Sequence, residues 1–181
     1  MRTFLREQLE RFLEAVDAAL AEPVEVIVIG GTAAALHYGV TRATHDIDTW
    51  TNVRADLAAA AKKARTVTGL DVPLQKSGVA DAPFDFESRL DRVLPKLRRL
   101  RVLVPERHDL VLMKAVRCYE HDLEAIAEIH SHSPLELDVL QAAINLGTVG
   151  EALDRVSNTD LDAAQKLVSL IQRGYLVTSQ G

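Results

Sequence analysis

Two kinds of hydrophobic pattern follow one another along the chain, and together they predict a mixed α/β half and a helical half. Apolar residues recur at three- and four-residue intervals over residues 3–21, with charged residues between them, which predicts an amphipathic helix. The run over residues 24–29 is β-branched and apolar on both faces for most of its length, so it predicts a strand in the middle of a sheet. Pro23 separates the two elements because proline cannot continue a helix.

Similar patterns extend over the rest of the chain. Before residue 105 they predict a short helix over 33–38, a strand over 46–51, an alanine-rich helix over 56–67 and a hairpin of strands 89–94 and 100–104. The apolar residues of the segment 69–88 follow neither a helical nor a strand period, so no element is assigned there. Beyond residue 105 the periods predict helices over 109–118, 122–129, 135–146 and 160–172. We therefore expect an α/β (α+β) core over residues 1–105, with a mixed sheet flanked by helices, and a C-terminal helical bundle over residues 106–181 packed on that core.

The composition narrows the class of protein. The 181 residues carry a net charge of −5, with 48% hydrophobic and 26% charged residues, which is typical of a folded globular domain and not of a disordered chain. The single cysteine excludes an internal disulfide and a cysteine zinc cluster, and favours a reducing cytoplasm. The charged N-terminus predicts no signal peptide, and the most apolar stretch, residues 24–40, is interrupted by Glu25, His37 and two glycines, which argues against a membrane span.

A glycine pair stands where the predicted strand over 24–29 gives way to a helix. Without side chains, Gly30 and Gly31 let a phosphate approach the backbone, and the following helix start offers amide N–H groups, to which Thr32 can add a hydroxyl. A tight turn that needs a positive φ angle explains the same two residues without any ligand.

Two aspartates follow in the next predicted strand. Asp46 and Asp48 are two residues apart, so both carboxylates project from one face of the strand. Like charges at this spacing repel unless a cation lies between them, and Mg²⁺ would relieve the repulsion while keeping open positions for triphosphate oxygens. A solvated strand face is the alternative for the aspartates alone, but the short helix places the glycine pair and the aspartate pair on neighbouring strands of one cleft.

The order Gly30-Gly31, short helix, Asp46-Ile47-Asp48 resembles the signature of the polymerase-β-like nucleotidyltransferase superfamily. Residues 38–44, Tyr-Gly-Val-Thr-Arg-Ala-Thr, are also similar to the Gly-x-x-Arg-x-Thr stretch of small bacterial members. Downstream, Lys114, Arg117 and the segment Asp122-Leu-Glu-Ala-Ile126 are similar to a helical block of abortive-infection-type nucleotidyltransferase toxins and of an uncharacterised nucleotidyltransferase-like family. Together these segments span roughly residues 24–130, most of the chain.

The resemblance implies a nucleotidyltransferase fold and a reaction. It implies an enzyme that moves a nucleotidyl group from an NTP to an acceptor such as tRNA or a protein, with Mg²⁺ or Mn²⁺ as the cofactor, either on its own or as the toxin of a toxin–antitoxin pair that has an antitoxin partner. The site residues it implies are Asp46, Asp48, Lys114 and Asp122 as catalytic, Asp46 and Asp48 as metal ligands, and Gly30, Gly31, Thr32, Lys114 and Arg117 as nucleotide-binding.

The downstream residues share a face if residues 109–122 form one helix. Lys114, Arg117 and His121 would then lie on one stripe, with Asp122 at its edge, where it orients Lys114 or Arg117 or acts as a base. A surface ion pair between Arg117 and Asp122 is the alternative, and it would contribute little.

The sequence departs from the superfamily pattern at one point. Active members commonly carry a third carboxylate on a later strand, and here Asp91, Asp85 and Glu87 are the candidates, none with convincing flanking residues. An incomplete site would favour a catalytically silent module of the same fold that binds a nucleotide or a partner.

The predicted hairpin is strongly basic. Lys96, Arg98, Arg99 and Arg101 protect an exposed sheet edge from aggregation or form a patch for an RNA backbone.

Overall fold

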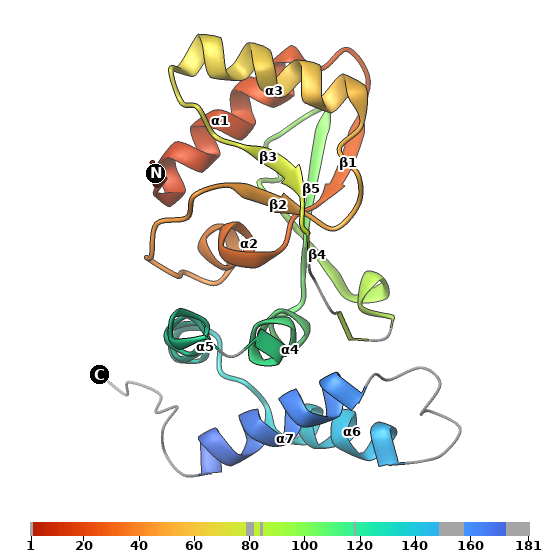
Figure 1. Cartoon of the computed structure of the whole chain (residues 1–181). Coiled ribbons are helices and arrows are strands. Elements are labelled where there is room, and N and C mark those ends of the chain that lie inside the picture. The colour runs from red at the N-terminus through yellow and green to blue at the C-terminus, as the bar shows by residue number, and fades with distance from the viewer. Residues whose placement is uncertain (1, 79–81, 84, 118, 149–157, 173–181) are drawn as a thin grey trace. The chain divides into compact units, whose positions relative to one another are not determined.

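The computed structural model describes residues 2–78, 82–83, 85–117, 119–148 and 158–172 (Figure 1). The chain divides into two compact units, one made of residues 1–79 and 90–105 and the other of residues 80–89 and 106–181. The fold class is the predicted one: a small mixed sheet flanked by helices, with further helices toward the C-terminus.

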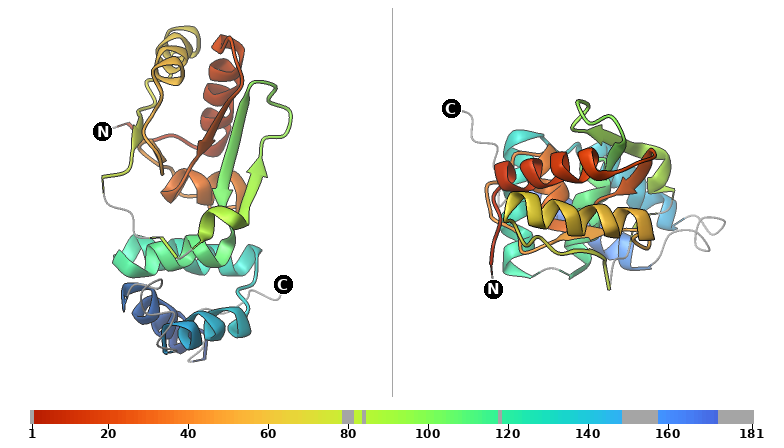
Figure 2. Two further views of the ribbon diagram at one scale, coloured as in Figure 1. Left: turned by 90° about the vertical axis from the view of Figure 1, so that its right-hand side faces the viewer. Right: turned by 90° about the horizontal axis from the view of Figure 1, so that it is seen from above.

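The first unit contains the helices α1 (Arg6–Ala19), α2 (Gly30–His37) and α3 (Ala55–Thr68). Helix α1 buries the apolar positions of its period, Leu9, Phe12, Leu13 and Val16, and it packs along α3 (Figure 2). Helix α3 ends at Gly69, whose φ of +69° is a left-handed conformation that glycine adopts without strain.

The main sheet of the first unit has the order β1-β5-β4, with strands β1 (Val24–Ile27), β4 (Leu90–Val93) and β5 (Leu100–Pro105). Strand β1 runs parallel to β5, and β4 forms an antiparallel hairpin with β5. Residue pairs in register present their side chains to the same face, and Val26 and Val93, which both pair with Val102, form part of a buried valine-rich layer.

A second, parallel pair of strands carries the aspartates. Strand β2 (Ile47–Thr49) pairs with β3 (Leu74–Lys76), and a single bridge between Val28 and Thr49 joins β2 to the residues that follow β1. The Ile29 amide donates to the Asp48 carbonyl at 3.0 Å, and Ile29 immediately precedes α2. These backbone bonds fix β2 beside the start of α2.

The second unit consists of a short 3₁₀ helix η1 (Phe86–Arg89) and the helices α4 (Arg107–Arg117), α5 (Glu120–His132), α6 (Leu137–Thr148) and α7 (Asn158–Gln172). Helix α4 packs on α5 and α7, and α6 packs on α7. The Arg89 guanidinium donates two hydrogen bonds, of 2.9 and 3.0 Å, to the Asp109 carboxylate. These bonds connect η1 to α4. Burial raises the pKa of Asp109, and the Arg89 contact opposes that rise.

Buried histidine rings hold the link between α5 and α6. His130 Nδ1 accepts the Leu135 amide at 2.9 Å, and His108 Nε2 accepts the Glu136 amide at 2.8 Å. An amide N–H can only donate, so each of these ring nitrogens is the acceptor of its bond. Burial lowers the pKa of His130.

Several predicted boundaries need correction. The strand predicted over 24–29 ends at Ile27 and lies at one end of the β1-β5-β4 order, with β5 in the middle and Glu25 exposed. Helix α2 begins at Gly30, three residues before the predicted start. Strand β3 lies in the segment to which the sequence assigned no element.

Candidate functional site

The structure requires glycine at both of the first two positions of α2, but for different reasons. Gly30 has a φ of +70°, which strains any residue with a side chain, and a Cβ there would meet Asp48 Oδ2 at 3.6 Å. A Cβ on Gly31 would meet Thr44 Oγ1 at 3.0 Å, so Gly31 permits close packing of the segment that leads into β2. Gly30 therefore fits the turn explanation, and the turn brings the helix start against the Asp48 side chain.

Thr32 fixes the backbone of the first aspartate. Its side chain is 1% exposed, and its hydroxyl donates to the Asp46 carbonyl at 2.6 Å. The hydroxyl thus ties the first turn of α2 to the residue that precedes β2. A phosphate contact donated by the Thr32 hydroxyl would require this bond to break.

The aspartates lie on the partly exposed face of β2. Ile47 and Thr49 are fully buried, and the alternation of a strand places Asp46, Asp48 and Trp50 on the opposite side. Both carboxylates are partly open to solvent and on one face, as the spacing predicts.

A residue that the sequence did not suggest joins this face from β3. Gln75 is in register with Asp48, and its Nε2 donates to Asp46 Oδ2 at 2.9 Å. No signal in the sequence marks Gln75, because β3 is only three residues long and largely exposed, so it carries neither a period nor an apolar run. We call Asp46, Asp48 and Gln75 the carboxylate face.

The candidates for a third carboxylate, Asp91, Asp85 and Glu87, belong to different units. Asp91 Oδ2 lies 3.3 Å from both His37 Nε2 and the Tyr38 hydroxyl, which are at the end of α2, whereas Asp48 is at its start. Asp91 therefore contacts residues at the opposite end of this eight-residue helix from Gly30. Asp85 and Glu87 belong to the second unit. In the described part of the chain, no three His, Cys, Asp or Glu side chains are grouped so that they could hold a metal ion.

The donors of the carboxylate face nevertheless fit Mg²⁺. This ion usually binds proteins through one or two carboxylates and completes its octahedron with water and substrate phosphates. Two aspartates on one strand face beside a helix start supply that number of protein ligands. Zinc sites in proteins usually include histidine or cysteine ligands, and the carboxylate face has neither.

Lys114 and Asp122 form a buried pair in the second unit. Lys114 Nζ lies 3.6 Å from Asp122 Oδ1, and the two side chains are 6% and 0% exposed. The pair joins α4 to α5, and Nε2 of the exposed His121 lies 3.9 Å from the buried Asp122 Oδ2. The sequence suggested Lys114 or Arg117 as the partner of Asp122, and the structure places Asp122 beside Lys114.

The single helix considered for residues 109–122 does not form. Helix α4 ends at Arg117, and α5 begins at Glu120 after Tyr119, whose backbone is extended (φ −70°, ψ 158°). His121 therefore lies on a different helix from Lys114 and is not part of one stripe with it. The side chain of Arg117 lies outside the described residues, as does Cys118.

The basic hairpin is partly neutralised by acidic neighbours. Lys96 Nζ lies 2.5 Å from Glu14, and Arg101 lies 3.4 Å from Glu25. Asp17 accepts the Arg99 and Leu100 amides at 2.6 and 2.7 Å. Burial alone would raise the pKa of Asp17, but the bonds from these amides hold it below its ordinary value. These contacts favour the structural explanation of the charges.

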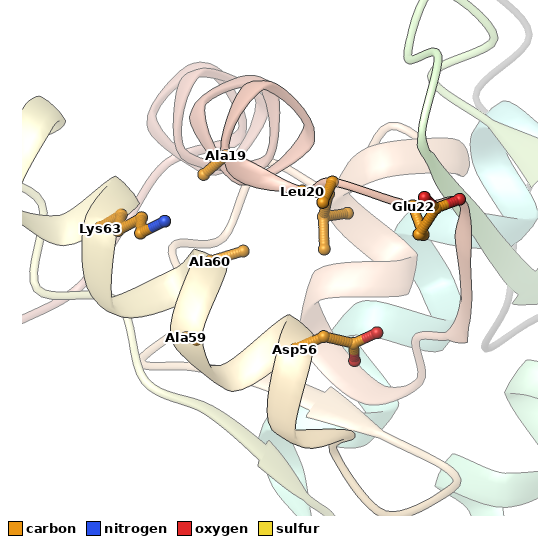
Figure 3. A pocket seen from close by; sticks show the side chains of 8 residues that line it. Ala19, Leu20, Glu22, Asp56, Ala59, Ala60 and Lys63 are labelled. Carbon is orange, nitrogen blue, oxygen red and sulfur yellow. The ribbon is translucent and has the colours of Figure 1, made fainter.

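A hollow of about 220 Å³ lies elsewhere in the first unit, between the end of α1 and the first turns of α3 (Figure 3). Alanine and leucine side chains form most of its wall, and Glu22, Asp56 and Lys63 stand around it. None of the predicted site residues lines this hollow, so it is separate from the carboxylate face.

Among the residues that the structure describes, every helix is too short or too polar to span a bilayer.

Comparison with known proteins gives one finding. No curated protein and no solved structure matches the chain. One family model matches residues 7–167, which is most of the chain and includes the glycine pair, both aspartates, Lys114 and Asp122. The chain belongs to that family, described as "Nucleotidyltransferase of unknown function (DUF6036)".

Proposed function

We propose that the protein transfers a nucleotidyl group from an NTP to an acceptor hydroxyl or phosphate, with Mg²⁺ held by Asp46 and Asp48. The observation that carries the proposal is the position of these aspartates. They share one face of β2, and Asp48 lies against Gly30 at the start of α2. A helix start attracts phosphate through its first amide groups, so a triphosphate could contact the helix start and the metal together.

In this reaction an acceptor oxygen attacks the α-phosphorus, the bond to the bridging oxygen breaks, and pyrophosphate leaves with the electron pair. When bound, Mg²⁺ would neutralise charge on the phosphate oxygens. Asp46 and Asp48 hold the ion, and the first amides of α2 orient the phosphates. Lys114 is proposed to contact a phosphate as a point charge, and Asp122 to orient Lys114 or take the acceptor proton.

The test is transfer of label from NTPs to macromolecules in a cell extract. Label from α-³²P NTPs and none from γ-³²P NTPs is expected, because only the nucleotidyl group is retained. Asp46→Asn and Asp48→Asn should abolish labelling while leaving the melting temperature unchanged or higher, since repulsion falls. Asp71→Asn is the control, because Asp71 is an exposed carboxylate of the same unit. Undiminished labelling by both site variants would reject the proposal.

A second function is favoured by one observation: among the described residues, no three His, Cys, Asp or Glu side chains are grouped so that they could hold a metal ion. A catalytically silent module would bind nucleotide and not transfer it. Calorimetry with each NTP and Mg²⁺ distinguishes the two, since binding without labelling indicates the silent module.

The acceptor class and a toxin role rest on the resemblance of the sequence. If the protein is a toxin, its expression should arrest growth, and Asp48→Asn should abolish the arrest. Recovery of the labelled species as nuclease-sensitive or protease-sensitive material then identifies an RNA or a protein acceptor.

A further inference from the structure

Strand β3 places one uncharged hydrogen-bond donor on the carboxylate face. Parallel strands in register present paired side chains to the same side, so Gln75, paired with Asp48, belongs to the face that also carries Asp46. Lys76, the next residue, pairs with Thr49 and belongs to the opposite face. The cationic residue of β3 is therefore directed away from the aspartates.

Asp46 is held at two points by different elements. Its backbone carbonyl accepts the Thr32 hydroxyl from α2 at 2.6 Å, and its Oδ2 accepts the Gln75 amide from β3 at 2.9 Å. Asp46 immediately precedes β2, and its carboxylate is bonded to β3 through Gln75. This bond limits rotation of the carboxylate.

A glutamine suits this position for an electrostatic reason. Its N–H occupies one of about four lone-pair positions on the carboxylate and leaves the others for a cation. A lysine or arginine would bring a positive charge that competes with a metal ion, whereas an amide leaves the negative charge of the aspartate pair intact.

Resting on the proposed function, in which Asp46 is a metal ligand, we propose that Gln75 is a positioning residue for the metal site. It holds the Asp46 carboxylate in the orientation that a divalent cation needs and does not contact the ion itself. Hydrogen-bond partners of ligating carboxylates typically change metal affinity by about 10- to 100-fold when removed.

The experiment is a titration with Mn²⁺ alone, followed by quenching of tryptophan fluorescence. Trp50 is the chain's single tryptophan and shares the strand alternation of Asp46 and Asp48, so a paramagnetic ion at the carboxylate face should quench it. Gln75→Met keeps the length of the side chain and removes the donor. The matched control is Gln165→Met, at an exposed position of α7.

We expect Gln75→Met to weaken Mn²⁺ binding by about 10- to 100-fold and Gln165→Met to leave it unchanged. The effect should depend on Asp46: in an Asp46→Asn background, Gln75→Met should cost little more, because the ligand it positions is gone. Circular dichroism of each variant checks folding, and Gln75→Leu is a second variant should Gln75→Met not fold.

The outcomes separate the two proposals. If the wild type does not bind Mn²⁺, the metal site and the role of Gln75 both fall. If Asp46→Asn weakens binding and Gln75→Met does not, only the role of Gln75 is wrong. Equal losses from Gln75→Met in the wild-type and Asp46→Asn backgrounds also overturn it, because Gln75 would then act independently of Asp46.

Discussion

Replacing Lys114 by methionine removes one half of a buried ion pair and leaves the other half behind. Lys114 Nζ and Asp122 Oδ1 are 3.6 Å apart, and the two side chains are 6% and 0% exposed. Water therefore cannot take over the role of the missing partner. Removing one partner of a buried ion pair typically destabilises a protein by about 3–5 kcal/mol, and we expect Lys114→Met to fall in this range.

The expected magnitude follows from burial and not from the number of charges. Arg6 and Glu10 form a comparable ion pair one helical turn apart on α1, with side chains that are 52% and 24% exposed. For Arg6→Met we expect a loss of about 0.3–0.5 kcal/mol. Lys114→Met and Arg6→Met each remove one positive charge. They differ in how far solvent reaches the carboxylate that remains.

Urea unfolding followed by circular dichroism measures both losses, and hydrogen exchange of amides in α4 and α5 assigns the Lys114→Met effect to the second unit. Replacing both partners, Lys114→Met with Asp122→Leu, should cost less than Lys114→Met alone, because no buried charge remains. A loss below about 1 kcal/mol for Lys114→Met, similar to a surface pair, would refute the reasoning.

This cycle also separates folding from function. A Lys114 variant without transfer activity could be inactive because the second unit unfolds. The double variant, if it regains stability and stays inactive, attributes the loss to the missing side chains of Lys114 and Asp122 and not to unfolding. Recovered activity in the double variant would exclude Lys114 from the reaction.

Three more predictions concern the same elements. Gly30→Ala should destabilise the first unit by about 1–2 kcal/mol, measured by urea unfolding, because φ is +70° there; an unchanged stability would contradict the left-handed turn. Stability should fall as the pH falls below about 6.5, the ordinary pKa of histidine. The reason is that burial lowers the pKa of His130, so the unfolded chain binds the proton more readily. His130→Gln should reduce that pH dependence, and an identical profile would refute it. Asp17→Ala should cost about 1–2 kcal/mol, because the amides at the start of β5 lose their acceptor; a thermal melt that matches wild type would argue against this bond.

The periodic elements could be predicted, and the isolated ones could not. Helix α1 and the β4–β5 hairpin follow from repeated apolar positions, because burial against a neighbouring element requires them. Strand β3 has no such requirement. Gln75 and Lys76 are exposed, and β3 pairs with β2 through backbone hydrogen bonds, which produce no hydrophobic period in the sequence.

The break between α4 and α5 illustrates a different limit. Residues 109–122 contain no proline or glycine, so periodicity alone extends one helix across them. The structure ends α4 at Arg117 and lets the chain turn at Tyr119, which brings Asp122 back to Lys114. Tertiary packing decides this turn, and a local pattern cannot record it.

The glycine pair, which first suggested a nucleotide site, is the weaker part of the evidence for one. Gly30 is needed for its φ angle and Gly31 for the approach of Thr44, and both requirements hold without any phosphate. Loss of activity in a glycine variant would therefore not distinguish a damaged turn from a lost ligand. Asp46 and Asp48 lie on a partly exposed face, and exchange of either for asparagine keeps the shape of the side chain and removes its charge. A function that depends on them must come from their charge, so the aspartate variants are the ones that can decide it.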